Sequence, residues 1–361
     1  MAQQRVLVTV PPLGTPGGVT HYYETLRAHL PEEIEYFQMG SRTQQDPPLQ
    51  TIVRMVRDYC RFIATLLVGR YDIVHVNPSL LIKAVCRDAV FLLLGAVLAK
   101  RTLVFFRGWD PAFGERLFRN FRGLFAWAYF RADAMVVLAS AYRETLQSIG
   151  YRKPVFVETT VVADAVFDGF QQTPGESADD SVNLLFLARI DRYKGVYGLL
   201  DAFARLRASF PSLVLNIAGD GPERENMLAY IDQRGIGNVR YLGYVTGKAK
   251  AQAFRMADIY LLLSDYEGMP NSLLEAMAFG LPVVSTPVGG VKDFFEDGRM
   301  GWLVERADPE LVADRLAALL ENPALRRSIG DYNRDYARRR FAASAVAQRL
   351  LQVYQQVSAD A

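Results

Sequence analysis

The sequence predicts an α/β protein built from two doubly wound parallel sheets. Short runs of β-branched and aromatic residues alternate with helical patterns of about ten to twenty residues, which is typical of parallel sheets with right-handed crossovers. The alternation is interrupted at residues 168–181, where glycine, proline and acidic residues indicate a linker. A length of 361 residues also favours two domains over one.

The strands are expected in two groups, one on each side of the linker. The first group is 5–10, 72–76, 102–106, 134–138 and 155–157. The second group is 183–188, 213–218, 239–242, 258–263, 282–285 and 302–304. Helical patterns lie between them and dominate residues 307–358, where the basic stretch 338–340 is expected in solvent or near a helix C-terminus. Ligands of open α/β sheets bind beyond the carboxyl ends of the strands, so the loops there are where site residues are expected.

Composition excludes several protein classes. Hydrophobic residues make up 50% and charged residues 22% of the chain, which excludes a disordered or collagen-like protein. The 41 basic residues nearly balance the 39 acidic ones, so no nucleic-acid partner is expected. Cys60 and Cys86 lack metal-ligand spacing and favour a reducing compartment.

These observations predict a cytoplasmic protein. The first residues, MAQQRVLVTV, lead directly into a strand and do not resemble a signal peptide. The longest apolar run, residues 89–99, has 11 residues and is too short to cross a bilayer. A peripheral position at the inner membrane face stays open, because residues 54–131 hold 13 basic and 5 acidic residues. This excess is either ordinary surface variation or a surface for an anionic membrane.

Two helical segments of this basic region are amphipathic. In residues 114–131, one face carries Leu117, Phe118, Phe121, Leu124, Phe125 and Ala128, and its flanks carry Arg116, Arg119, Arg122 and Arg131. Residues 54–70 show the same mixture. Aromatic residues with flanking arginines suit a membrane interface. A helix that crosses over a parallel sheet also needs an apolar stripe, so both interpretations stay open.

The first expected strand leads into a glycine-containing loop, PPLGTPGGVTHYYETL. Gly17 and Gly18 precede a helix expected to begin near Val19, and the free N–H groups at its start suit a phosphate or another anion. The loop is neither the dinucleotide motif G-x-G-x-x-G nor a Walker loop. A strand-to-helix turn that merely tolerates glycine would have the same sequence.

Two strand ends in the second half carry polar residues. In ARIDRYKG, Arg189 and Lys194 could neutralise a diphosphate, although such a pair is alone more often ordinary surface charge. In IAGDGPER, Gly219 begins a strand-to-helix turn that is by itself structural.

The segment SDYEGMPNSLLEAMAFGLPVVST is the most informative. Glu267 lies in a loop broken by Pro270, just ahead of a helix expected to begin at Asn271 or Ser272. Glu275 follows in the first turns of that helix. An alternative for Glu275 is structural, because Ser272-x-x-Glu275 has the spacing of a capping box.

Taken in order, ARIDRYKG, IAGDGPER, VRYLGYV and SDYEGMPNSLLEAMAFGLPVVSTPVGG resemble family 4 of the retaining glycosyltransferases. The resemblance covers essentially the whole chain and is strongest in the second half. It implies the GT-B fold, in which two doubly wound Rossmann-like domains face a central cleft. Residues 1–167 would then bind the acceptor and residues 168–339 the nucleotide sugar, and a C-terminal helix, 340–358, would return to the first domain.

The resemblance implies transfer of a sugar, with retention, from a nucleotide diphosphate sugar (UDP or GDP) to a glycan or lipid-linked acceptor. The pathway would be polysaccharide or glycolipid biosynthesis, and no divalent metal or other cofactor is implied. Arg189 and Lys194 would bind the diphosphate and stabilise its departure. Glu267 would hold sugar hydroxyls or face the developing oxocarbenium, and Glu275 would bind the ribose hydroxyls.

Further donor contacts are implied by the same resemblance. The sugar and phosphate would meet the backbone around Met269, Pro270, Asn271 and Ser272, although Pro270 has no N–H to donate. Gly219 and Tyr244 would border the donor, Tyr244 near the base. Gly17 and Gly18 would approach the phosphates from the first domain.

One position departs from the family pattern. In FFRGWD, Arg107 stands where the family often has a histidine that touches the donor sugar around its C6 substituent. Arg107 either binds an anionic group, a carboxylate on the donor or a phosphate on the acceptor, or pairs with Asp110 or another carboxylate and shapes the pocket. The second interpretation is preferred on sequence grounds.

Two other functions stay open. The chain could be a catalytically silent GT-B binding subunit, although the joint presence of Arg189, Lys194, Glu267 and Glu275 argues against that. It could also be a nucleotide-sugar epimerase, which would need an acid/base network that the sequence does not reveal.

Overall fold

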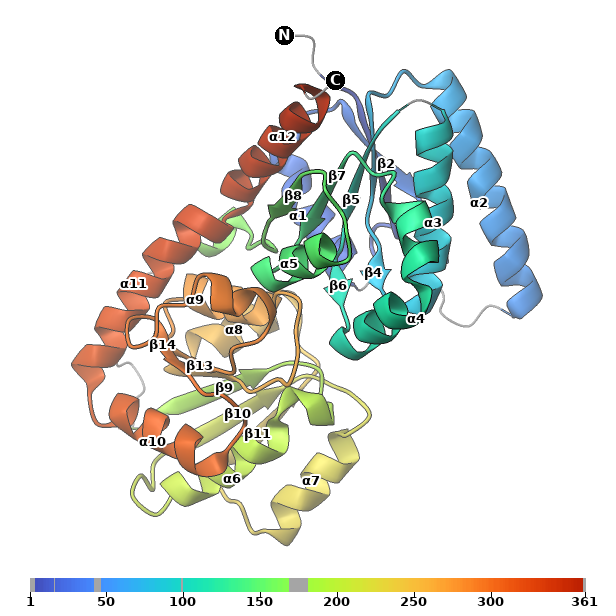
Figure 1. Ribbon diagram of the computed structural model, residues 1–361. Helices are drawn as coiled ribbons and strands as arrows, with labels where there is room; N and C mark the ends of the chain where they lie inside the picture. Colours follow the sequence, from blue (N-terminus) through green and yellow to red (C-terminus); the bar gives the residue numbers. More distant parts are fainter. Residues whose placement is uncertain (1–3, 16, 42–46, 99, 169–180, 360–361) are drawn as a thin grey trace. The chain divides into compact units, whose positions relative to one another are not determined.

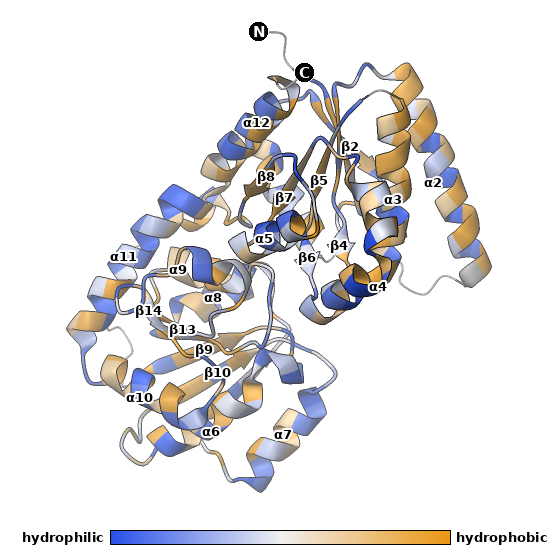
Figure 2. Ribbon diagram, viewed as in Figure 1, coloured by the Kyte–Doolittle hydropathy of each residue, from blue (hydrophilic) through white to orange (hydrophobic). Residues whose placement is uncertain are grey.

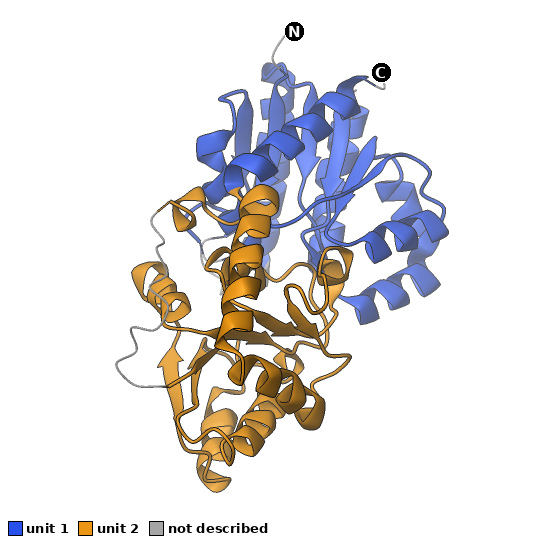
Figure 3. Ribbon diagram, turned by 90° about the vertical axis from the view of Figure 1, so that its left-hand side faces the viewer, with its two compact units in different colours: residues 1–161, 343–361 blue, residues 162–342 orange. Residues whose placement is uncertain are grey.

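The computed structural model describes residues 4–15, 17–41, 47–98, 100–168 and 181–359 (Figure 1). The chain forms two compact units: unit 1 is Met1–Val161 with Ala343–Ala361, and unit 2 is Val162–Ala342 (Figure 3). The predicted domain boundaries fall after residues 167 and 339, whereas the two units divide after residues 161 and 342. Most of the expected linker, residues 169–180, lies outside the described residues.

Unit 1 contains a six-stranded parallel sheet in the order β2-β1-β3-β5-β7-β8. Its strands are β1 (Val6–Val10), β2 (Ile34–Gln38), β3 (Ile73–Val76), β5 (Arg101–Phe105), β7 (Ala134–Val137) and β8 (Val155–Val157). Two short strands, β4 (Ser79–Leu80) and β6 (Gly108–Trp109), pair separately. All five predicted strands are present with ends shifted by at most one residue. The edge strand β2 is not predicted, because glutamates at 32, 33 and 35 interrupt its apolar pattern.

The helices of unit 1 cover both faces of this sheet. They are α1 (Gly18–Leu26), α2 (Pro48–Val68), α3 (Ile82–Val97), α4 (Pro111–Tyr129), α5 (Ser140–Ser148) and α12 (Ala343–Ala359), with a 3₁₀ turn, η1 (Arg27–His29). On one face, Phe62 of α2, Phe91 of α3 and Phe125 of α4 belong to a single buried core. On the other face α12 packs against α1 and β5. The C-terminal helix is therefore part of unit 1.

Unit 2 contains a second six-stranded parallel sheet, in the order β11-β10-β9-β12-β13-β14. Its strands are β9 (Asn183–Leu187), β10 (Val214–Ala218), β11 (Val239–Gly243), β12 (Ile259–Leu262), β13 (Val283–Ser285) and β14 (Gly301–Leu303). These also lie within one residue of the predicted strands at each end. The strand order reverses between β9 and β12, which is the point where doubly wound sheets bind ligands.

Helices cover both faces of the second sheet as well. They are α6 (Val196–Leu206), α7 (Arg224–Gln233), α8 (Gly247–Arg255), α9 (Asn271–Ala278), α10 (Pro309–Leu320) and α11 (Pro323–Phe341), with 3₁₀ turns η2 (Asp164–Val166), η3 (Arg192–Lys194) and η4 (Gly289–Asp293). The basic stretch 338–340 lies in the last turn of α11, as predicted. Among the helices that the structure describes, none combines the length and the apolar character needed to cross a membrane.

Candidate functional site

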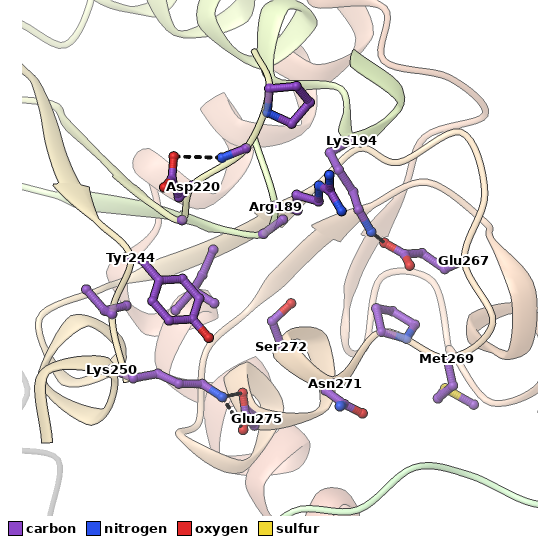
Figure 4. A pocket seen from close by; sticks show the side chains of 17 residues that line it. Arg189, Lys194, Asp220, Tyr244, Lys250, Glu267, Met269, Asn271, Ser272 and Glu275 are labelled. Atoms are coloured by element: carbon purple, nitrogen blue, oxygen red, sulfur yellow. Dashed lines mark hydrogen bonds and ion pairs between the residues drawn. The ribbon is translucent and has the colours of Figure 1, made fainter. Parts of the chain in front are cut away.

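A pocket of about 890 Å³ lies at the carboxyl ends of the strands of unit 2 (Figure 4). The loops after β9, β10, β11 and β12 form it, so it includes the point where the strand order reverses. Its lining contains the residues that the sequence analysis selects in the second half: Arg189, Lys194, Gly219, Tyr244, Glu267, Met269, Pro270, Asn271, Ser272 and Glu275. These residues, up to 86 positions apart, are thus brought to one edge of one sheet.

The two predicted cations differ in their surroundings. Arg189 lies two residues after β9 and exposes 65% of its side chain, with Nε 3.8 Å from Asp191 Oδ2. Lys194 ends η3 and exposes only 12% of its side chain. Its Nζ forms an ion pair with Glu267 (Figure 4). Arg189 therefore presents most of its charge to solvent, whereas Lys194 is held inside the lining.

A glycine makes the position of Lys194 possible. Gly195 has a φ of +76°, and a Cβ atom there would lie 2.1 Å from the carbonyl oxygen of Leu263. No other residue type fits this combination of left-handed backbone and close approach. As a result η3 packs directly against the end of β12, and Lys194 reaches the loop that carries Glu267.

Glu267 is fixed from two sides. Besides the ion pair with Lys194, its Oε1 accepts a hydrogen bond of 2.9 Å from the Ser264 hydroxyl. Beside this pair the ring of Tyr193 stacks on that of Tyr266 with centroids 4.6 Å apart, and Lys194 Nζ lies 4.9 Å from the Tyr193 centroid. Glu267 thus belongs to a cluster of side chains that contact one another.

A second ion pair lies across the pocket. Lys250 of α8 donates a hydrogen bond of 2.6 Å to Glu275 of α9, and the side chain of Glu275 is 10% exposed. Lys250 is not among the predicted site residues, because nothing in the sequence of its helix distinguishes it from Lys248. Its position on the helix after β11 is the only sequence signal that could have identified it.

The start of α9 is not where a capping box between Ser272 and Glu275 would require it. The helix begins at Asn271, with Pro270 as its N-cap and no side-chain cap. Ser272 therefore lies inside the first turn, and its hydroxyl accepts a hydrogen bond of 2.6 Å from Tyr260. Burial raises the pKa of Tyr260, so its hydroxyl stays protonated and donates. The capping box between Ser272 and Glu275 is thus not formed, and that interpretation is wrong.

A second close approach shapes the loop after β10. Gly219 has a φ of +143°, and a Cβ atom there would lie 1.9 Å from the carbonyl oxygen of Ala188. The Tyr241 hydroxyl donates a hydrogen bond of 2.9 Å to the carbonyl oxygen of Gly219. Tyr241 therefore supports this loop, while Tyr244, which is 69% exposed, lines the pocket.

Three predicted site residues belong to unit 1. Gly17 is the N-cap of α1 and Gly18 its first residue. Arg107 lies two residues after β5. The preferred pairing of Arg107 with Asp110 is wrong, because the Asp110 side chain instead caps α4 by accepting a hydrogen bond of 3.0 Å from the Phe113 N–H. Within the described part of the chain, Arg107 forms no ion pair.

Comparison with solved structures identifies the fold. The structure of HepE from Anabaena in complex with UDP aligns over 98% of this chain and 100% of its own, with a TM-score of 0.78 and 17% identity. This likeness and the two sheets described above define the GT-B fold of two Rossmann-like units. The predicted fold class is thereby confirmed.

Comparison of sequences relates the second half of the chain to a known family. Residues 170–336 match the family described as Glycosyl transferases group 1. The colanic acid biosynthesis glycosyltransferase WcaL of Escherichia coli K12 is 27% identical over 72% of this chain and 63% of its own length. The phosphatidyl-myo-inositol mannosyltransferase of Mycobacterium leprae is 36% identical over 48% of this chain and 46% of its own. The chain is thus related to the glycosyl transferases of group 1, and the resemblance stated from its motifs is confirmed at that level.

Proposed function

We propose that this protein is a retaining, metal-independent glycosyltransferase. It transfers a sugar from a nucleotide diphosphate sugar, with UDP or GDP as the nucleotide, to a glycan or lipid-linked acceptor in polysaccharide or glycolipid biosynthesis. The observation that carries the proposal is the pocket at the strand-order reversal of unit 2, with one Lys–Glu pair on each side. The names of the similar proteins support it, because they describe a colanic acid biosynthesis glycosyltransferase, a phosphatidyl-myo-inositol mannosyltransferase and a complex with UDP.

Arg189 and Lys194 are the proposed diphosphate ligands. Arg189 exposes 65% of its side chain beside Asp191, and Lys194 lies on the same side of the pocket (Figure 4). Two cations can neutralise the charge that develops on the leaving diphosphate, which is the task that a divalent metal performs in other enzymes. The first residues of α9 add N–H groups at a helix N-terminus, which favours an anion.

The two glutamates are assigned different parts of the donor. Glu275, held by Lys250, is proposed to accept hydrogen bonds from the ribose hydroxyls, with Tyr244 beside the base. Glu267, held by Ser264 and Lys194, is proposed to face the sugar ring. A fixed carboxylate there stabilises the positive charge that the ring gains as its bond to the diphosphate breaks.

The proposed reaction proceeds on one face of the sugar. The bond between the anomeric carbon and the diphosphate oxygen breaks, and the acceptor hydroxyl oxygen bonds to that carbon from the same side. The hydroxyl proton passes to the departing phosphate oxygen, so no protein side chain need act as a base. Arg189 and Lys194 stabilise the diphosphate through this step.

Titration calorimetry with UDP, GDP and ADP in the presence of EDTA tests the donor site. We expect one nucleotide to bind without metal, and Arg189→Ala to weaken it about tenfold or more, because a charged hydrogen bond is lost. Arg192→Ala is the matched control, since Arg192 lies on η3 and pairs with Glu223 at 3.2 Å instead of lining the pocket. No binding by any nucleotide would leave a silent GT-B binding subunit as the better interpretation.

Product analysis tests the chemistry. Proton NMR of the first glycoside formed should show the anomeric configuration of the donor, and EDTA should leave the rate unchanged. An inverted product would contradict the retaining mechanism. Conversion of the donor sugar to its epimer without transfer would instead support the nucleotide-sugar epimerase.

We also propose that the protein works in the cytoplasm, at the inner face of a membrane, through α2. This helix buries Asp58, Phe62 and Leu66 at four-residue spacing. The opposite face is also apolar and carries the exposed residues Leu49, Ile52, Val53, Val56 and Leu67 (Figure 2). A helix that only crosses over a sheet needs one apolar face, so the second one calls for an apolar partner.

The charges around this second face favour an anionic membrane. Arg54, Arg57 and Arg61 lie along one side of the exposed apolar stripe, as in helices that lie in a membrane interface. In α4 the predicted apolar face is divided: Phe125 is buried, whereas Phe121 and Leu124 are exposed. Both free cysteines are exposed, which suits the reducing cytoplasm.

Co-sedimentation with vesicles tests this proposal. We expect binding to vesicles that contain phosphatidylglycerol and little binding to pure phosphatidylcholine. The double variant Val56→Glu, Leu67→Glu should abolish binding without loss of stability, since both side chains are more than half exposed. Met256→Glu, at a half-exposed apolar residue of unit 2, is the matched control. Equal binding of all variants, or recovery of the native protein in every supernatant, would overturn the membrane proposal.

A further inference from the structure

Unit 1 holds a cation that its described residues do not neutralise. The side chain of Arg107 is largely enclosed, and its Nε and Nη1 atoms are buried without a hydrogen-bond partner in the described part of the chain. Its backbone is fixed, because the Arg107 N–H donates a hydrogen bond of 2.8 Å to the carbonyl oxygen of Pro78. Most buried polar atoms in proteins are hydrogen-bonded, so two unpaired nitrogens on one guanidinium need an explanation.

Aromatic rings hold this guanidinium in place. Its central carbon lies 3.8 Å from the ring centroid of Tyr22 and 4.3 Å from that of Phe105. The two rings are perpendicular to each other, with centroids 5.9 Å apart. Such contacts orient an arginine, but they leave its Nε and Nη1 atoms without a hydrogen-bond partner.

The neighbouring charges leave the cation uncompensated. Asp110 caps α4. Glu158 and Arg107 both influence the pKa of Tyr22 through their charges. Glu158 is already paired with Arg349, because Arg349 Nε lies 3.2 and 3.0 Å from its two carboxylate oxygens. His75 adds no negative charge and is itself neutral at pH 7, because burial and the nearby Arg107 lower its pKa to about 3.

The buried charge of Arg107 should lower the stability of the folded protein unless an anion binds to it. Burial lowers the pKa of Arg107, although arginine stays protonated at physiological pH. A buried charge without a partner is strongly unfavourable, and replacing it with an apolar residue often stabilises a protein. An arginine kept in this position without a carboxylate is well suited to an anionic ligand.

We propose that Arg107 is an anion-recognition residue that binds a carboxylate or phosphate group of a sugar substrate in unit 1. The proposal rests on the proposed glycosyltransferase function. It restricts one substrate of that reaction to a sugar that carries an anionic group. The shared chemistry is an anionic oxygen group that accepts hydrogen bonds from a guanidinium already held by Tyr22 and Phe105. The group belongs either to the donor, as a uronic acid carboxylate, or to the acceptor, as a sugar phosphate.

Binding measurements with paired probes distinguish these sources. One arm compares UDP-glucuronate with UDP-glucose, and the other compares glucose 6-phosphate with glucose, with and without UDP. In one arm, the native protein should bind the charged probe at least about tenfold more tightly than its neutral counterpart, as expected for a charge-assisted hydrogen bond. The arm that shows the preference identifies the source of the anion.

Arg107→Met should remove this preference, and its unfolding midpoint should equal or exceed that of the native protein. Arg101→Met is the matched control: Arg101 begins the same strand, but it is paired with Asp133 at 3.4 Å and should leave the preference intact. Arg107→Lys keeps the positive charge and should retain part of the preference, so it serves as the second variant if Arg107→Met does not fold. All titrations are made below the unfolding midpoint of every variant, so lost stability cannot be mistaken for lost binding.

The proposal is overturned if neither arm shows a preference for the charged probe, or if Arg107→Met retains it. Titration of UDP, GDP and ADP alone separates this result from failure of the proposed function. If one nucleotide binds and the charged probes gain nothing, only the inference about Arg107 fails. If none of the three binds, the glycosyltransferase proposal fails, and the phosphate arm without nucleotide still decides whether Arg107 recognises an anion.

Discussion

Lys250 and Glu275 join two helices of unit 2 at the edge of the pocket, with Lys250 Nζ 2.6 Å from each oxygen of the Glu275 carboxylate. The pair fixes a carboxylate that is 10% exposed, on the side of the pocket away from Lys194 and Glu267 (Figure 4). Glu275 therefore depends on Lys250 both for its orientation and for compensation of its charge.

Lys250→Met should weaken UDP binding about tenfold, because Glu275, the proposed ligand of the ribose hydroxyls, loses the partner that orients it. It should also lower the free energy of unfolding by about 1–3 kcal/mol, since Lys250 is only partly exposed and the carboxylate of Glu275, which is 10% exposed, loses its partner. Calorimetry and denaturant unfolding measure the two effects. Lys248→Met, at an exposed position of the same helix, is the control, and equal effects of the two substitutions would contradict a specific role for the pair.

Glu267→Gln separates catalysis from donor binding. The substitution releases Lys194 from its ion pair, so we expect UDP to bind as tightly as before or a few-fold more tightly. Turnover should fall about 100-fold or more, because the charge proposed to face the developing oxocarbenium is lost. Glu225→Gln, on the exposed side of α7, should change neither quantity. Parallel losses in UDP affinity and turnover would mean that Glu267 acts mainly in binding.

The strands could be predicted because buried parallel strands give short, nearly continuous apolar runs bounded by turn residues. The same logic located the site in unit 2, since the carboxyl ends of neighbouring strands must meet at one edge. It fails for β2, an edge strand whose apolar pattern is interrupted by Glu35 and Gln38.

Partners of individual side chains could not be predicted in this way. Lys194 and Glu267 are 73 positions apart, and Lys250 and Glu275 are 25 apart. Their pairing follows from the packing of η3 on β12 and of α8 beside α9, which no local pattern encodes. Arg107 shows the opposite case, because Asp110 is near in sequence but is used as a helix cap.

Gly18 offers a test of ligand approach in unit 1. Its backbone does not require glycine, and a Cβ atom there would have no atom within 4 Å apart from its own local backbone. Gly18→Ala should therefore stabilise the protein by about 0.4–1 kcal/mol. If donor phosphates approach this point, the same substitution should lower turnover at limiting donor.

Gly14→Ala provides the contrast, because Gly14 has a φ of +82° and alanine there should destabilise the protein by about 1–2 kcal/mol. Thermal unfolding and initial rates measure both variants. Full activity in a stabilised Gly18→Ala protein would show that this glycine only tolerates the turn, as the structural alternative in the sequence analysis states.

His75 should make unit 1 sensitive to acid. The residue is fully buried, with Nδ1 2.8 Å from the Tyr354 hydroxyl, and burial together with the charge of Arg107 lowers its pKa to about 3. An unfolded histidine has a pKa of about 6.5. Between these two values the unfolded chain binds a proton that the folded chain does not, so stability is fully present above pH 6.5 and declines as the pH falls toward 3.

The contribution of His75 to the free energy of unfolding should therefore fall by about 1.4 kcal/mol for each pH unit below 6.5. Denaturant unfolding at pH 7, 6 and 5 measures this slope. A Trp302→Phe background restricts the fluorescence signal to Trp109 and Trp127 of unit 1. His75→Gln should remove the slope, whereas His29→Gln, at an exposed position, should keep it. The same slope in both variants would mean that carboxylates, and not His75, govern the acid response.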